Sequence, residues 1–246
     1  HRAEGTLATS PDDTLARVNQ LLVSQGWQVP VAARAEAADL GTVWVACDGE
    51  KIFDAVKEEG YNVIVTDPDL PSGSDRIYAA LTQIDPKQHY DVVVNVQGDM
   101  PTLDPRIIKH AVQLLENPAV DIGTLAATIT NEAEKDDPAV VKVLISPSLR
   151  EREGRSGGIQ QGRALSFSRT YTPGSYHHIG IYAYRRKALE KFVALPPSPL
   201  ELHEKLEQLR ALEAGMRIDV AVADTVPVGV DTPETLEKAR KYYETV

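Results

Sequence analysis

Short apolar runs alternate with amphipathic stretches over the first half of the chain. Each run is rich in Val and Ile and has the length of a buried strand, whereas the stretches between them repeat their apolar residues every three to four positions, as a helix does. We expect strands at 43–47, 62–66 and 91–96, and helices at 50–59, 74–83 and 106–116. This β-α-β-α-β-α order predicts a mostly parallel sheet with helical crossovers.

The second half of the chain has a different pattern. We expect strands at 122–130, 140–145, 164–168, 179–184 and 218–223, and helices at 200–214 and 232–243. No long helix separates the first two of these strands, which favours a mixed and partly antiparallel extension of the sheet. The segment 147–163, rich in Ser, Gly, Arg and Glu, is typical of a surface loop. The predicted fold class is therefore α/β, with a mostly parallel central sheet and a smaller mixed-sheet extension.

Size and charge narrow the possible functions. The chain has 246 residues, and we expect one domain over 1–246. Its formal net charge is −10, whereas a nucleic-acid partner needs a basic footprint, so we expect no nucleic acid. No run reaches the roughly 18–20 apolar residues of a membrane span, and no signal pattern is seen, so we expect a cytoplasmic protein without membrane contact. The single cysteine, Cys47, lies in an apolar run and is expected to be buried.

Two aspartates stand where α/β proteins often bind ligands. Asp99 follows the strand 91–96 in the run Gln97-Gly98-Asp99, at the carboxyl end of a strand. A carboxylate there suits magnesium when the substrate carries phosphates, whereas a plain turn is the structural alternative. Asp231 stands at the start of the helix 232–243, where Asp231 or Thr232 can act as the cap, so a purely structural role for Asp231 is the alternative. If Asp231 approaches Asp99, the pair can hold one divalent ion.

The helix expected at 74–83 begins with Ser72-Gly-Ser-Asp-Arg76. Hydroxyl groups around a glycine at a helix N-terminus can cradle an anion or a polar ligand, so Ser72 and Ser74 are candidate binding residues. Ser74 can equally be only the N-cap. Arg76 opposes the helix macrodipole, so a carboxylate or phosphate partner would stabilise it there.

Two histidines, His177 and His178, enter the strand expected at 179–184. Because side chains alternate along a strand, His178 and Tyr182 are predicted to share one face. A histidine at the start of a strand is more often structural than functional, and the local pattern leaves both readings open.

Seven short motifs occur in order along the chain. They are Ser72-Gly-Ser-Asp-Arg76, Asn95-Val-Gln-Gly-Asp99, Phe167-Ser-Arg169, His178-Ile-Gly-Ile-Tyr-Ala-Tyr-Arg185, Ser198-Pro-Leu-Glu201, Leu206-Glu-Gln-Leu-Arg210 and Val230-Asp-Thr-Pro-Glu234. Together they resemble the 3-deoxy-manno-octulosonate (Kdo) cytidylyltransferase family, from about residue 29 to the C-terminus. The resemblance implies a Rossmann-like nucleotidyltransferase fold.

The resemblance also implies an activity and partners. Members of this family condense CTP with Kdo to give CMP-Kdo and pyrophosphate, using Mg2+, for lipopolysaccharide assembly, and they form homodimers. The part that binds the sugar and forms the dimer is expected within about 163–215. Apolar residues in excess of one core face mark a candidate interface, namely Phe192, Leu195, Leu200 and Leu202.

Site residues carry over motif by motif. The family implies that Asp99 and Asp231 bind magnesium and that Arg76 binds the sugar carboxylate. The other residues expected around the sugar are Gln97, His178, Tyr182 and Glu207. Ser72 and Ser74 are expected near the nucleotide.

The chain departs from the family at two places. Met100 stands where the family has Glu after Gly-Asp. Residues 1–28 lack the basic phosphate loop of the family, and 12–23 are more typical of a capped helix. Arg17 is the one nearby cation that could contact the phosphates, and Asp12-Asp13 would repel them. We therefore expect weak CTP binding.

Three readings remain open on the sequence. The first is an active cytidylyltransferase for Kdo. The second is a sugar-acid-binding homologue that has lost CTP turnover. The third is a cytidylyltransferase for another sugar acid, such as sialic acid, although the motifs around His178 and Glu207 favour Kdo.

Overall fold

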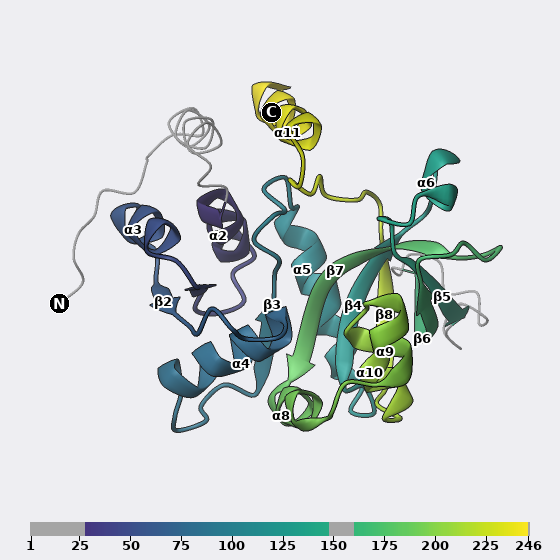
Figure 1. The fold of residues 1–246 in the computed structure, drawn as a ribbon, viewed down its shortest axis with the longest axis horizontal. Helices are drawn as coiled ribbons and strands as arrows, with labels where there is room; N and C mark the ends of the chain where they lie inside the picture. The colour runs from purple at the N-terminus through teal and green to yellow at the C-terminus, as the bar shows by residue number, and fades with distance from the viewer. Residues whose placement is uncertain (1–27, 148–159, 246) are drawn as a thin grey trace. The chain divides into compact units, whose positions relative to one another are not determined.

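The computed structural model describes residues 28–147 and 160–245 (Figure 1). The chain divides into two compact units. Unit 1 comprises the residues up to Leu70, 96–105 and those from Pro227, and unit 2 comprises 71–95 and 106–226. Neither unit is a continuous piece of chain, and the single domain expected from the sequence stays a prediction. No helix within the described ranges is long and apolar enough to cross a bilayer.

Unit 1 contains one parallel strand pair. Its elements are α2 (Gln28–Ala37), β1 (Val45–Cys47), α3 (Glu50–Glu58), β2 (Val63–Val65) and α11 (Pro233–Thr245). Strands β1 and β2 pair in parallel with Val45 opposite Val63, and α3 connects them, as the apolar runs predict. Cys47 is buried in β1, also as predicted. Helix α2 was not predicted; its Pro30 lies in the first turn, where proline is tolerated.

Unit 2 is built on a six-stranded sheet. Its strands are β3 (Val92–Asn95), β4 (Ile122–Ala127), β5 (Lys142–Pro147), β6 (Gln161–Ser168), β7 (Tyr176–Arg185) and β8 (Ile218–Ala223). Its helices are α4 (Gly73–Ile84), α5 (Pro105–Gln113), the 3-10 turn η1 (Leu114–Glu116), α6 (Ala133–Asp136), α8 (Arg186–Ala194), α9 (Pro199–Glu204) and α10 (Gln208–Glu213). The strand order is β3-β7-β4-β8-β6-β5.

The described pairings do not confirm a mostly parallel sheet. In the six-stranded sheet, β4 and β8 are parallel, whereas the other described pairs are antiparallel. The reason is that a continuous apolar run reports burial on both faces of a strand and carries no information about the direction of its neighbours. Strand β4 is buried at every position, yet it has one antiparallel and one parallel neighbour. The mixed part of the sheet, predicted as an extension, is therefore its larger part here.

Helices cover both faces of this sheet (Figure 1). On one face, α4, α8 and α10 contribute Leu81, Phe192 and Leu209 to a core shared with Tyr184 of β7. On the other face lies α5. A Cβ atom on Gly123 of β4 would lie 2.2 Å from a backbone carbonyl oxygen of α5, so only glycine allows this close approach.

The prediction of a single helix at 200–214 is wrong. The chain forms α9 and α10 instead, because Lys205 adopts the left-handed conformation (φ 55°) and ends α9. A capping box between Ser198 and Glu201 starts α9, and Arg210 of α10 donates to Glu201 at 2.8 Å. Burial alone would raise the pKa of Glu201, but hydrogen bonds from Arg210 and from the Ser198 N–H hold it below its ordinary value.

The dimer interface expected from the sequence is wrong for Phe192 of α8. Phe192 is only 1% exposed and packs in the core of unit 2, so it is not available to a partner. Leu195 also packs against that core. Leu200 and Leu202, on α9, are 50% and 66% exposed and remain candidates for an interface.

We predict that Arg210→Met lowers the free energy of unfolding by about 3–5 kcal/mol, because it leaves Glu201 buried without its ion-pair partner. Methionine keeps an apolar stem beside Phe192, whose ring the guanidinium of Arg210 faces at 4.9 Å. Urea unfolding at neutral pH measures the change. Lys135→Met, which removes an exposed ion pair with Glu132, is the matched control and should match wild type. Equal stability of Arg210→Met and wild type would contradict the role given to this pair.

Candidate functional site

Asp99 lies in the loop that follows β3, beside the segment that leads into α11. The backbone N–H of Val230 donates to the carbonyl oxygen of Asp99 at 2.8 Å. The backbone N–H of Val228 donates to the side-chain oxygen of Thr102 at 2.7 Å. These two bonds join distant parts of the sequence within unit 1. They bring the loop that carries Asp99 next to the one that carries Asp231.

The two aspartates influence each other electrostatically. Burial raises the pKa of Asp99; its own backbone N–H lowers it in part, and the charge of Asp231 raises it again. The Oδ1 atom of Asp99 is buried without a hydrogen-bond partner. A bound cation would give the unpaired oxygen a ligand and would reduce the repulsion between the two carboxylates.

The donor set fits magnesium. Among the described residues, no cluster of three or more His, Cys, Asp or Glu side chains could hold a metal. Magnesium needs no such cluster, since it is commonly held by one or two carboxylates together with substrate phosphates and water. Asp99 and Asp231 supply hard carboxylate oxygens of the kind it prefers.

Thr232, and not Asp231, caps α11. The side-chain oxygen of Thr232 accepts from the N–H of Thr235 at 3.2 Å, and the N–H of Thr232 donates to the hydroxyl oxygen of Thr235 at 3.0 Å. The carboxylate of Asp231 is therefore not needed to start the helix, and the residue is exposed. Of the two caps that the sequence allowed, Thr232 is confirmed and Asp231 is wrong.

Ser72 is the N-cap of α4. Its hydroxyl oxygen accepts from the N–H of Asp75 at 3.2 Å, and its hydroxyl donates to the Asp75 carboxylate at 2.7 Å. The alternative that Ser74 is the cap is wrong, because α4 already starts at Gly73. Ser74 is fully buried, whereas Arg76 is partly exposed.

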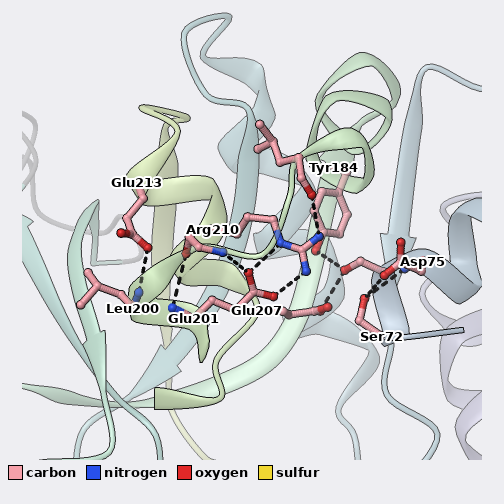
Figure 2. Close-up of polar contacts among 11 residues, drawn as sticks. Ser72, Asp75, Tyr184, Leu200, Glu201, Glu207, Arg210 and Glu213 are labelled. Atoms are coloured by element: carbon pink, nitrogen blue, oxygen red, sulfur yellow. Dashed lines mark hydrogen bonds and ion pairs between the residues drawn. The ribbon is translucent and has the colours of Figure 1, made fainter. Parts of the chain in front are cut away.

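Ser74 connects α4 to Glu207, the residue that directly precedes α10. Its hydroxyl donates to Oε1 of Glu207 at 2.9 Å (Figure 2). Because that proton is used, the hydroxyl of Tyr184, 3.1 Å away, is the donor to Ser74. Tyr184 is buried, and burial raises its pKa far above the ordinary value, so it keeps the proton that it donates. Oε2 of Glu207 is buried without a partner.

His178 and Tyr182 lie side by side on β7, as predicted. Their ring centroids are 5.6 Å apart, and the Phe167 ring meets His178 edge-on at 4.9 Å. Burial, together with the nearby His177, lowers the pKa of His178 to about 3. His178 is therefore neutral at physiological pH and cannot act there as a cation.

Arg169 secures the chain just before Glu207. Its side chain donates to the carbonyl oxygen of Glu204 at 2.9 Å and to that of Pro138 at 2.8 Å. Its backbone N–H donates to the Glu204 carboxylate at 3.0 Å. The Phe167-Ser-Arg169 motif thus supports the site from two sides, with Phe167 against His178 and Arg169 at the end of α9.

The predicted site residues fall into two groups. Unit 1 carries Gln97, Asp99 and Asp231, and unit 2 carries Ser72, Ser74, Arg76, His178, Tyr182 and Glu207. Within unit 2, the rings of Tyr182 and Tyr184 are 5.9 Å apart. Tyr182 therefore lies between His178 and the residue whose hydroxyl group donates to Ser74. Arg17 and the departure at 12–23 lie outside the described residues.

Sequence reasoning missed two residues of this site, Tyr184 and Thr124. Tyr184 holds Ser74, as above, and Thr124 of β4 contacts Nε2 of His178 at 3.0 Å. A signal was present for Thr124. It is a polar residue inside an apolar strand, and a buried polar group must find a hydrogen-bond partner.

Comparisons with known proteins agree with the motifs. The sequence model of the family described as cytidylyltransferase matches residues 27–218. The chain is 56% identical over 216 residues to a 3-deoxy-manno-octulosonate cytidylyltransferase of Parvibaculum lavamentivorans, covering 86% of this chain and 80% of that one. It is 52% identical to a protein of the same name from Paramagnetospirillum magneticum, covering 86% of this chain and 85% of that one.

Solved structures share the fold. The chain is similar to CMP:2-keto-3-deoxy-manno-octonic acid synthetase complexed with CTP, with a TM-score of 0.74, 35% identity and coverage of 89% of this chain and 88% of that one. It also resembles 4-diphosphocytidyl-2C-methyl-D-erythritol synthase from Anaerococcus prevotii, with a TM-score of 0.57, 10% identity and coverage of 88% and 89%, which shows the fold alone. The predicted α/β nucleotidyltransferase fold is thereby confirmed.

We predict that acid weakens the fold through His178. The folded pKa of about 3 lies below the unfolded value of about 6.5, so the unfolded state alone takes up a proton as the pH falls below 6.5. Between about pH 7.5 and 5.5, wild type should lose about 1.4 kcal/mol more stability than His178→Gln. Urea unfolding at the two pH values measures this difference. His203→Gln, at an exposed histidine, should behave like wild type. Parallel losses in wild type and His178→Gln would show that His178 titrates normally.

Proposed function

We infer the function from the family to which this chain belongs: it is a cytidylyltransferase, and within that family it is a member of the 3-deoxy-manno-octulosonate cytidylyltransferases. The chain is an enzyme that uses CTP to activate Kdo, giving CMP-Kdo and pyrophosphate. The agreement between its sequence relatives and a solved CTP complex carries this conclusion.

The reaction transfers a cytidylyl group. The anomeric hydroxyl oxygen of Kdo bonds to the α-phosphorus of CTP, and the bond from that phosphorus to pyrophosphate breaks. The hydroxyl proton leaves to solvent, so no covalent intermediate on the protein is needed. Transfers of this kind depend on positioning and on neutralising charge more than on a protein nucleophile.

We propose that the polar groups of unit 2 hold the sugar acid. Arg76 is assigned to the carboxylate of Kdo, because a guanidinium can bind a carboxylate through two parallel hydrogen bonds. His178 is neutral, and Oε2 of Glu207 is buried without a partner. Both can accept hydrogen bonds from sugar hydroxyls. By motif, Tyr182 is assigned to the same ligand. The role in sugar binding that the motif implies for Gln97, a residue of unit 1, stays a prediction.

We propose that Asp99 and Asp231 bind Mg2+. The unpaired Oδ1 of Asp99 and the raised pKa of its carboxyl group support this assignment. When bound, magnesium neutralises phosphate charge and lowers the pKa of a coordinated hydroxyl group. The two carboxylates lie on loops joined by the Val230 to Asp99 hydrogen bond, so their positions are set before substrates arrive.

The residues predicted to bind the nucleotide are Ser72, Ser74 and Arg17. Ser72 keeps its proposed place near the nucleotide, although its hydroxyl already caps α4. The hydroxyl of Ser74 is engaged with Glu207, so we propose that Ser74 serves the sugar side of the site instead. Arg17 stays a proposed phosphate contact. The match to the family model begins at residue 27, after the departure at 12–23.

The relatives bear on the alternatives. Both curated relatives named above carry the Kdo activity in their names, which favours Kdo over sialic acid as the substrate. The same names favour an enzyme with turnover over a sugar-acid-binding homologue that has lost it. We further propose that the product serves lipopolysaccharide assembly and that the enzyme is cytoplasmic.

We predict that Asp99→Asn and Asp231→Asn each abolish magnesium-dependent release of pyrophosphate from CTP and Kdo, because each removes one charged ligand of the ion. Both variants should fold, since neither side chain caps a helix. Glu237→Gln, which changes an exposed carboxylate of α11, is the control and should keep wild-type turnover. Near-normal turnover in either aspartate variant would rule out the shared metal site, and no turnover in wild type would rule out the function itself.

We also propose a homodimer. The family implication is the main support. Leu165 of β6 and Leu200 and Leu202 of α9 are 59%, 50% and 66% exposed, so they are available to a partner. We predict a mass of twice 26.9 kDa by light scattering at micromolar concentration. Leu202→Glu should lower that mass, whereas Leu40→Glu, at a 45% exposed leucine of unit 1, should not. A monomeric wild type would contradict the proposal.

A further inference from the structure

Thr124 is the one polar residue of strand β4, and its side chain is fully buried. We propose that Thr124 is a positioning residue that holds His178 as the neutral tautomer with its proton on Nε2, which leaves Nδ1 as a hydrogen-bond acceptor for a hydroxyl of the sugar substrate. The assignment of the proton stands on geometry alone. Its consequence for the substrate rests on the proposed function.

An irregularity in β7 creates the contact. Thr124 pairs with Tyr182 and Leu125 with Ile179, so Gly180 and Ile181 are skipped in the pairing of β7 with β4. A shift of two residues preserves the alternation of side chains, which keeps His178 and Tyr182 on one face. The skipped carbonyl group of Ile181 turns toward the hydroxyl of Thr124, 2.8 Å away.

Counting protons then assigns the tautomer. Two oxygen atoms 2.8 Å apart need a proton between them, and the Ile181 carbonyl has none, so the Thr124 hydroxyl donates to it. That hydroxyl can then only accept from Nε2 of His178, 3.0 Å away. Nε2 must therefore carry the proton. A neutral imidazole has one N–H, so Nδ1 is left with a lone pair.

The surroundings of His178 agree with a neutral ring. Phe167 meets the ring edge-on, and the Tyr182 ring lies beside it. The neighbouring His177 is on the other side of the strand, where its Nδ1 contacts Glu134 at 2.9 Å. Burial lowers the pKa of His178 to about 3, which removes the doubly protonated form at working pH.

The tautomer determines what the site can recognise. With the proton on Nε2, His178 has an acceptor at Nδ1. Oε2 of Glu207 is a second acceptor, buried without a partner. Acceptors of this kind select ligands rich in hydroxyl donors. With the proton on Nδ1, that nitrogen would be a donor and could not accept a hydrogen bond from a hydroxyl group. Thr124 therefore acts on the sugar through His178, without touching it.

The first test is spectroscopic and needs no substrate. Wild-type protein labelled with 15N at its histidines is expected to show, for His178, a pyrrole-type signal at Nε2 and a pyridine-type signal at Nδ1. The spectrum of His178→Gln identifies these signals among the six histidines. A pyrrole-type Nδ1 in the wild-type protein would overturn the proposal, whatever the enzyme does.

The second test uses variants of Thr124. Thr124→Val keeps the shape and removes the acceptor, so it is expected to raise KM for Kdo about tenfold, which corresponds to about 1.4 kcal/mol, with KM for CTP unchanged. It should also add Nδ1–H character to the His178 spectrum. Thr124→Ser restores the hydroxyl and should restore both values. Thr82→Val, which removes an exposed hydroxyl from α4, should change neither.

The outcomes separate the two proposals. An unchanged tautomer and an unchanged KM for Kdo in Thr124→Val would overturn the positioning role. If Thr124→Val does not fold, wild type and Thr124→Ser must still share the same tautomer, and a difference between them would count against the assignment. Absence of Kdo-dependent turnover in wild type would remove the proposed function and leave the spectroscopic test of His178 standing.

Discussion

The antiparallel pairing of β7 is the constraint on which unit 2 depends. This strand pairs with β3, β4 and β5, and each pairing joins segments that are far apart in the sequence. Closing such loops costs conformational entropy, which burial of apolar surface on both faces of the sheet offsets. The strand is thereby held on both edges. His178, Tyr182 and Tyr184 project from it, so the pairing that builds the sheet also positions the candidate sugar site.

Buried polar groups on the inward face of β7 are matched by partners from other elements. Ser74 joins Tyr184 to Glu207, and Thr124 joins His178 to the irregular part of β7. Each hydroxyl both donates and accepts, which satisfies two neighbours with one atom. Oε2 of Glu207 is left over as an acceptor, and a buried acceptor is costly unless a ligand supplies a donor. The same unpaired acceptor therefore lowers the stability of the free protein and can bind a hydroxyl group of the ligand.

Unit 1 poses an electrostatic problem that the sugar side does not have. Asp99 is partly buried near a second carboxylate, in a chain of net charge −10. CTP is an anion, so bringing its phosphates to such a place requires compensating positive charge. In the proposed function a divalent cation supplies this charge, whereas Arg76 is a proposed ligand of the sugar carboxylate in unit 2. The acidic composition is compatible with substrate charge that is neutralised locally.

Local chemistry carried by the sequence accounts for many of the elements and for the choice of candidate site residues. Apolar periodicity marked β1, α3, β2 and β8 because it records burial, and the family motifs named Asp99, His178 and Glu207 as candidates, whose roles stay predictions. Neither signal contains the identity of a strand's neighbour. The six-stranded sheet is therefore mixed where a mostly parallel one was expected, and the helix predicted at 200–214 breaks at Lys205. Only the tertiary structure decided that Ser74, Tyr184 and Glu207 meet, and that Thr124 assigns the proton of His178, because those contacts join residues 54 to 133 positions apart.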